Sequence, residues 1–310
     1  MESEHLAITR FGFGTGEKKW DQWKESPPER VKHSRIVISS AWGRIYRVLY
    51  RLGEEEREFI AKINSKDGCA RNELEALKRT REWFREKGIP WFIYLYHYKV
   101  EGGKTSMILE HADADLFHYL SKRQPDATYS RSWWASIIMQ VIFAVADLQK
   151  YRMNHNDLKC TNIFLKRVEK GGFWVWEHRR KKYLIPNEGF LIRVGDFGLS
   201  SWPERPNYVV EENEEYYSEY GLSQAFRPGY DLNLFLYDLC FGRSVTVKPP
   251  RDLLIKLRPL ISTGNEGRLP LGVENDRTVP SELIQVFASD YEIESWAGKE
   301  VDIWGQFRVI

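Results

Sequence analysis

The alternation of apolar and polar residues divides the chain into a strand-rich segment followed by a helix-rich segment. In the first segment, apolar residues near helical spacing predict one helix at Ala70–Lys87, closed by Gly88 and Pro90. Short apolar runs separated by turn residues predict strands on both sides of this helix. These strands are expected at Ile36–Ile38, Arg44–Tyr50, Glu58–Asn64, Phe92–Val100 and Thr105–Leu109.

The helix-rich segment follows His111. Its longest predicted helix, Ser132–Tyr151, is apolar over most of its length, which is typical of a buried core helix. A hairpin with a basic tip is expected at Phe173–Leu184, and a further strand at Phe190–Val194. The remaining predicted helices are Leu116–Ser121, Tyr230–Phe241, Arg251–Leu260 and Ser281–Ser289.

These elements predict an α+β fold with two lobes. Residues 1–33 are charged and contain consecutive prolines, so we expect them to form an N-terminal extension. Residues 34–110 form the predicted small lobe, with five antiparallel strands and one helix. Residues 111–310 form the larger, mainly helical lobe, with the inserted hairpin inside residues 163–195.

Composition excludes few classes of function. The formal net charge of +2 gives no reason to expect a nucleic-acid partner. The three cysteines are odd in number and lack metal-binding spacing. The first residues lack the features of a signal peptide, and no uncharged apolar stretch approaches the length of a membrane span. We therefore expect a monomeric intracellular protein, cytoplasmic or nuclear, without a membrane partner.

Two short strings carry the candidate chemistry. The first, residues 154–165, places Asp157, Lys159 and Asn162 within six positions, between an apolar helix and an apolar strand. A carboxylate can accept a hydroxyl proton, a lysine can neutralise phosphate, and an amide oxygen can hold Mg²⁺. The second string, residues 194–198, places Asp196 at a strand end beside Phe-Gly.

These strings resemble the catalytic-loop and metal-binding signatures of the protein kinase family. The resemblance implies the two-lobed kinase fold, with ATP and Mg²⁺ as cofactors. It makes Asp157 the catalytic base, places Lys159 on the γ-phosphate, and assigns Mg²⁺ to Asn162 and Asp196. A lysine two positions after the base is the serine/threonine-type arrangement, so the implied reaction is phosphorylation of serine or threonine in a protein substrate.

The resemblance extends to the nucleotide site. It implies that Lys62 contacts the α- and β-phosphates and pairs with Glu73, with Glu75 as the alternative partner. Leu109 would guard the back of the adenine pocket, and Asp231 would brace the catalytic loop. The other cofactor-binding positions implied are Ser40, Gly43, Ile45, Ala61, Glu110 and Ala112 for the nucleotide and Asp115 for its ribose.

The chain departs from the family pattern in several places. Ile38 and Ser40 stand where the first two glycines of the phosphate loop belong, which predicts a stiffer loop and weaker ATP affinity. Asn156 stands where many kinases have arginine, so switching by activation-loop phosphorylation is not expected. No Ala-Pro-Glu follows. The long insertion, which ends in residues 183–189 before Asp196, resembles that of kinases of large DNA viruses, and together with the reduced C-terminal lobe it is similar to divergent haspin-like kinases. A viral origin would place the protein in the host cell or virion.

Several alternatives stay open. The acidic run at 211–219 is either a solvated loop or a surface that favours basic peptide substrates, and the basic hairpin tip is either a solvated turn or a contact for an acidic partner. The rival functions are a pseudokinase scaffold and a small-molecule phosphotransferase. Cys160, inside the catalytic loop, is a candidate for oxidation or alkylation.

Overall fold

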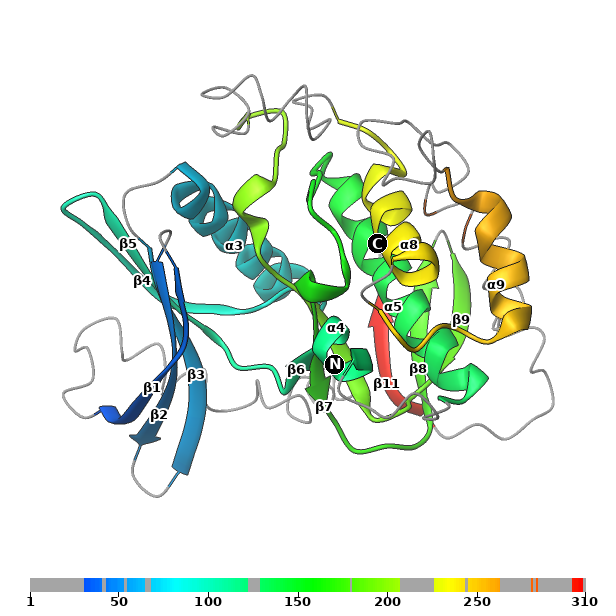
Figure 1. Cartoon of the computed structure of the whole chain (residues 1–310), viewed down its shortest axis with the longest axis horizontal. Coiled ribbons are helices and arrows are strands. Elements are labelled where there is room, and N and C mark those ends of the chain that lie inside the picture. The colour runs from blue at the N-terminus through cyan, green and yellow to red at the C-terminus, as the bar shows by residue number, and fades with distance from the viewer. Residues whose placement is uncertain are drawn as a thin grey trace.

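The computed structural model places the described elements in a strand-rich part and a helix-rich part, which confirms the α+β class (Figure 1). The connection between the two parts runs from the end of β5 through residues 111–113. The described residues are 31–40, 43–52, 55–64, 68–121, 129–178, 180–206, 226–242, 245–262, 280, 283 and 303–308.

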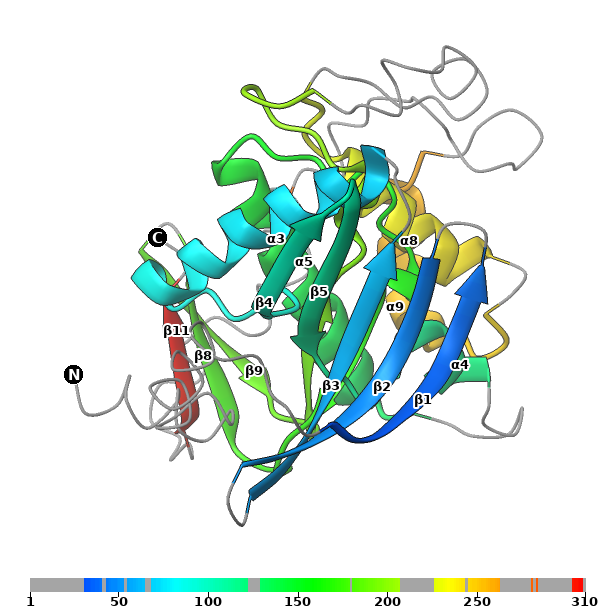
Figure 2. The same cartoon turned by 90° about the vertical axis from the view of Figure 1, so that its left-hand side faces the viewer.

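The strand-rich part contains a five-stranded sheet with the order β1-β2-β3-β5-β4 (Figure 2). All neighbouring strands are antiparallel. Gly102 and Gly103 both have positive φ angles and form the tight turn between β4 and β5. The strands are β1 (Val31–Ser40), β2 (Gly43–Leu52), β3 (Glu55–Asn64), β4 (Leu95–Glu101) and β5 (Lys104–Glu110).

One predicted strand is wrong at its start. The run expected to begin at Phe92 joins the sheet only at Leu95. The preceding residues pair instead with the strand that leads into Asp196: Ile93 N–H donates to Val194 O at 2.9 Å, and Val194 N–H donates to Trp91 O at 2.6 Å. Apolar alternation did not distinguish the two partners, because both are buried β-structure.

Helix α3 (Gly68–Lys87) lies beside the sheet (Figure 1). Its apolar side is buried. Leu74, Leu77 and Trp83 are buried on this side. The helix ends where predicted: Gly88 adopts a positive φ of 68° and its N–H donates to Phe84 O, which is a common way to close a helix.

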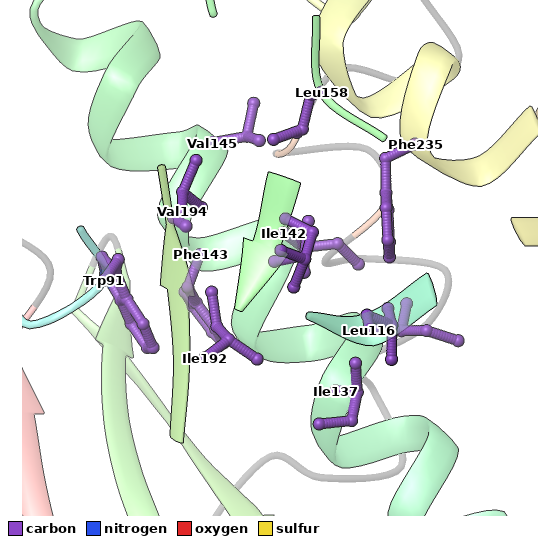
Figure 3. Packing of buried hydrophobic residues seen from close by; sticks show 14 of the residues in the cluster. Trp91, Leu116, Ile137, Ile142, Phe143, Val145, Leu158, Ile192, Val194 and Phe235 are labelled. Carbon is purple, nitrogen blue, oxygen red and sulfur yellow. The ribbon is translucent and has the colours of Figure 1, made fainter. Parts of the chain in front are cut away.

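The helix-rich part is built around α5 (Arg131–Lys150). Ser130 caps this helix by accepting a hydrogen bond from Trp133 N–H at 3.1 Å. By length and composition α5 could cross a bilayer, but most of it is buried inside the protein, as in the core helix of a globular domain. Figure 3 shows Ile137, Ile142 and Phe143 of α5 packed among residues from neighbouring elements.

Shorter helices surround α5. The helices α4 (Leu116–Ser121) and α8 (Tyr230–Phe241) coincide with their predicted ranges. The predicted helix at Arg251–Leu260 is α9 (Arg251–Leu257) followed by the 3₁₀ turn η4 (Arg258–Leu260). Most of the predicted helix at 281–289 lies outside the described residues. Two further 3₁₀ turns, η2 (Cys160–Asn162) and η3 (Phe197–Leu199), belong to the candidate site.

Two small sheets complete the larger part. The first has the order β10-β7-β6, from β6 (Ala114–Asp115), β7 (Ile163–Arg167) and β10 (Phe190–Val194). The second contains the predicted inserted hairpin, β8 (Phe173–His178) and β9 (Lys181–Pro186). A strand not predicted from the sequence, β11 (Ile303–Arg308), pairs with β8 in parallel (Figure 2).

Candidate active site

The loop after α5 is held by a buried carboxylate. Asp231, at the start of α8, accepts hydrogen bonds from the backbone N–H groups of His155 and Asn156, each at 2.8 Å. Burial raises the pKa of Asp231, and the nearby His155 partly opposes this rise. The ring of His155 also lies 3.0 Å from Gly195 O, so the loop is tied to the end of β10 as well.

The loop presents three of the predicted residues together. Lys159 Nζ lies 2.8 Å from Asp157 Oδ1, and Asn162 Nδ2 lies 2.7 Å from Asp157 O and 3.0 Å from its Oδ2. Asn162 is buried, whereas the side chains of Asp157 and Lys159 are partly exposed. The buried amide of Asn162 therefore fixes Asp157 from beneath, and Asp157 in turn pairs with Lys159 near the surface.

Lys62 links the two parts of the protein. Its ammonium lies 2.7 Å from Glu73 Oε2 and 3.2 Å from Asp196 Oδ1. Burial works against the charged lysine, but the two carboxylates outweigh it and raise the pKa of Lys62. Glu75, the alternative partner, instead pairs with Lys78 at 3.1 Å. The structure thus places Glu73, rather than Glu75, on Lys62.

Asp196 lies at the turn between β10 and η3. Its backbone is left-handed, with φ 64° and ψ 62°, and its side chain is about half exposed. Burial of the group would raise its pKa, but the charge and hydrogen bond of Lys62 prevail, so the pKa of Asp196 is lowered and the carboxylate is ionised at neutral pH.

Asn162 and Asp196 have the chemistry of a magnesium site. Because the Asn162 amide N–H₂ is turned to Asp157, its Oδ1 is left as an acceptor, and Asp196 supplies an ionised oxygen. No cluster of three or more His, Cys, Asp or Glu side chains suited to a metal occurs among the described residues. The pair of oxygen donors from Asn162 and Asp196 fits Mg²⁺, which proteins commonly hold with one or two side chains while phosphate and water complete the coordination shell.

The predicted nucleotide-binding positions lie at the end of β1 (Ser40), along β2 and β3, at the end of β5, and in the residues that follow it, Ala112 and Asp115. Ala61 and Leu109 are buried, and Ile45 is partly buried. Asp115, predicted for the ribose, accepts hydrogen bonds from the backbone of His118 at 2.7 Å and lies 2.6 Å from the His118 ring. Its carboxylate therefore also caps α4. Contact of Asp115 and of the partly buried Ala112 with a nucleotide stays a prediction.

Gly43 has a packing role that the sequence did not indicate. A β-carbon added there would lie 2.5 Å from Ile63 O, on the neighbouring strand β3. Gly43 pairs with Ser40 across the β1–β2 turn, whose residues 41–42 lie outside the described part of the chain. Glycine is therefore needed at this position for the close approach of the two strands, whatever its contact with phosphate.

A buried ion pair behind the site was missed at the sequence level. Arg193, in β10, is fully buried and its Nε donates to Glu110 Oε2 at 2.8 Å. The Nη1 of Arg193 donates to Pro90 O at 2.6 Å. An arginine inside the apolar run Phe190–Val194 was the available signal, because such a charge requires a partner. The resemblance assigns Glu110 only to the nucleotide site.

The hypothesis that Cys160 is open to modification is wrong for the folded chain. Its side chain is completely buried, and burial together with Asp238 raises the pKa of the thiol well above its usual value. A reactive cysteine must be accessible and must form the thiolate readily, and Cys160 meets neither condition.

The chain is also similar in sequence to known kinases. A family model described as protein tyrosine and serine/threonine kinase matches residues 31–220, more than half of the chain. The "Putative serine/threonine-protein kinase 019R" of Frog virus 3 is 34% identical over 94 residues, which is 29% of this chain and 10% of the viral protein.

Two proteins of Schizosaccharomyces pombe are also similar. Sporulation protein kinase mde3 is 26% identical over 112 residues, covering 36% of this chain and 17% of the yeast protein. Mitosis inducer protein kinase cdr1 is 28% identical over 125 residues, covering 40% of this chain and 17% of the yeast protein. The matched segments therefore span less than a fifth of each of these three relatives.

Proposed function

Because the chain belongs to the protein tyrosine and serine/threonine kinase family, we propose that it transfers the γ-phosphate of Mg·ATP to serine or threonine hydroxyls of a protein substrate. One observation carries this proposal: Lys62, held by Glu73, lies 3.2 Å from Asp196. Asp196 directly follows Gly195, whose carbonyl oxygen contacts the ring of His155 in the loop of Asp157. The residues that phosphoryl transfer needs for positioning and charge neutralisation thus converge from four separate segments: β3, α3, the loop after α5 and the turn after β10.

In this proposal Lys62 holds the α- and β-phosphates. The ammonium is kept charged by two carboxylates and oriented by Glu73, so it presents a fixed positive charge beside Asp196. Asn162 and Asp196 would hold Mg²⁺, which when bound neutralises charge on the phosphates. Leu109, Ala61 and the backbone at Glu110 and Ala112 would receive the adenine.

Asp157 is the proposed catalytic base. Its Oδ2 accepts a hydrogen bond from the buried Asn162 and its Oδ1 contacts Lys159, so the carboxylate is fixed in orientation while remaining partly exposed to a substrate hydroxyl. It would accept the proton of that hydroxyl as the phosphate is transferred. Lys159, released from Asp157 by the incoming phosphate, would neutralise the charge on the transferred group.

Serine or threonine specificity and a preference for basic peptides are finer parts of the proposal. The position of Lys159 two residues after Asp157 and the name of the similar viral protein support the first. The acidic run at 211–219, which lies outside the described residues, supports the second through its charge.

The test is transfer of labelled γ-phosphate from Mg·ATP to a basic protein and to serine- and tyrosine-containing peptides. Wild type is compared with Asp157→Asn and Asp196→Asn, and acid hydrolysis identifies the phosphorylated residue. We expect phosphoserine or phosphothreonine from the wild type, and a loss of at least about 100-fold in both variants. Nucleotide binding without transfer by the wild type would instead support a pseudokinase.

A further inference from the structure

Two asparagine side chains hold the backbone immediately after Asp196. Asn72, in α3, directs Nδ2 toward the carbonyl oxygens of Phe197 at 3.3 Å, Gly198 at 3.1 Å and Ser200 at 2.6 Å. The intervening carbonyl, that of Leu199, accepts a hydrogen bond from Asn156 Nδ2 at 2.8 Å. All four carbonyls from residue 197 to residue 200 therefore face a neutral amide donor.

The two donors come from opposite sides of the turn. Asn72 precedes Glu73, the partner of Lys62, on α3, and it is fully buried. Asn156 belongs to the catalytic loop, one residue before Asp157, and its Nδ2 also lies 3.0 Å from Ser201 Oγ. The turn is thus clamped between the helix that orients Lys62 and the loop that presents Asp157.

The orientation of Asn72 follows from its surroundings. Three carbonyl oxygens repel another oxygen, so the amide nitrogen must face them. Its own Oδ1 is buried without a hydrogen-bond partner among the described residues, which is an unfavourable arrangement. An apolar side chain would avoid this cost but would leave buried carbonyls of the turn without their donor, and an aspartate would repel them.

We propose that Asn72 and Asn156 are positioning residues that hold Asp196 in its metal-binding orientation without any phosphorylated group. This proposal rests on the function proposed above and specifies how its metal-binding turn is kept in place. Asp196 is in the left-handed region with φ 64°, a conformation that is uncommon for aspartate and needs support from its surroundings. Neutral amides on the following carbonyls supply that support, and they do so at any phosphorylation state of the chain.

The first experiment separates metal-dependent from metal-independent nucleotide binding. ADP affinity is measured by calorimetry with and without Mg²⁺ for wild type, Asn72→Leu and Asn156→Gly; glycine at 156 tolerates the positive φ of 65° found there. We expect the gain in ADP affinity caused by Mg²⁺ to fall by about tenfold or more in both variants, because fewer molecules hold Asp196 in place. Affinity without Mg²⁺ should stay within about twofold of the wild type.

Thr80→Val is the matched control on α3. Thr80 is as buried as Asn72, but its hydroxyl donates only to Leu77 O of its own helix among the described contacts. This variant tests general damage to the helix without touching the turn. It should keep the wild-type gain in affinity on addition of Mg²⁺.

The second experiment needs no activity. Hydrogen exchange of the backbone amides of Ser200 and Ser201, which are bonded to Phe197 O and Asn154 O, is compared in the same proteins. Faster exchange in Asn72→Leu and Asn156→Gly, with Thr80→Val unchanged, supports the clamp even if the wild type transfers no phosphate. Wild-type exchange and a wild-type effect of Mg²⁺ in both asparagine variants would overturn it, and an active wild type would then leave the kinase proposal standing.

Discussion

The indole of Trp91 stacks on the indole of Trp176, with ring centroids 3.9 Å apart. Trp91 lies in the connection between α3 and β4, and Trp176 lies in the inserted hairpin, so the insertion packs directly against the segment that precedes the five-stranded sheet. Phe143 of α5 continues the stack, with its ring centroid 5.7 Å from that of Trp176; Figure 3 shows Trp91 and Phe143 close together. The insertion is therefore part of the core.

Replacing Trp176 with alanine tests this role. Trp176 is completely buried, so its removal should lower the free energy of unfolding by about 3 to 5 kcal/mol, through lost burial and a residual cavity. Urea denaturation measures the change. Ile255→Ala, at a side chain that is 63% exposed, should change stability by less than about 0.5 kcal/mol. A loss below about 1 kcal/mol for Trp176→Ala would show that the hairpin is not part of the core.

The pair of glutamates on α3 permits a controlled test of Lys62 orientation. Glu73→Gln should lower kcat/KM by at least about 30-fold, because Lys62 loses the buried carboxylate that fixes it. Glu75→Gln is the matched control, since Glu75 pairs with Lys78. Steady-state phosphorylation of one peptide compares the three proteins. Equal losses in the two variants would contradict the assignment of Glu73.

The ion pair between Arg193 and Glu110 should behave as a buried unit. Arg193→Met alone should destabilise the protein by about 3 to 5 kcal/mol, because it leaves the Glu110 carboxylate buried without its partner. Adding Glu110→Leu should recover at least half of that loss. A double-mutant cycle on urea unfolding measures the coupling. Additive losses in the double variant would mean that the two residues stabilise the fold independently.

Asp147 predicts a pH dependence of stability. Burial raises its pKa from 3.8 to about 7, although the hydrogen bond from the Trp91 indole at 2.8 Å and the nearby Lys150 and Lys87 oppose the rise. The unfolded chain releases this proton near pH 4 and the folded chain only near pH 7. The contribution of Asp147 to stability is therefore complete below pH 4 and is lost as the pH rises to about 7.

Asp147→Asn should remove this dependence while keeping an acceptor for Trp91. The variant should gain about 2 to 3 kcal/mol of stability over the wild type as the pH rises from 5 to 7.5. Urea unfolding at both pH values gives the comparison. A difference between wild type and variant that is the same at the two pH values would contradict the raised pKa.

Much of the local structure followed from the sequence. Periodicity located α4, α8 and the β8–β9 hairpin, because each is defined by neighbouring residues and their turns. The strings around Asp157 and Asp196 pointed to the candidate site for the same reason: the spacing of their side chains is set within a single loop. The roles of these residues in catalysis remain predictions.

Long-range partners were decided only by tertiary structure. The sequence left Glu73 and Glu75 as alternatives for Lys62, and the packing of α3 against the sheet turned one toward the lysine and the other toward Lys78. The same packing brought Asn72 onto the backbone of residues 197–200, more than 120 positions away.

Two other contacts likewise join segments that are far apart in the sequence. They are the parallel pairing of β11 with β8 and the ion pair between Arg193 and Glu110. Hydrophobic periodicity indicates which side of a helix or strand is buried, but it does not indicate which other element packs against that side. The sequence by itself therefore determined the elements and the chemical groups of this protein, whereas the choice of partner for each buried amide and charge depended on the complete packing of the chain.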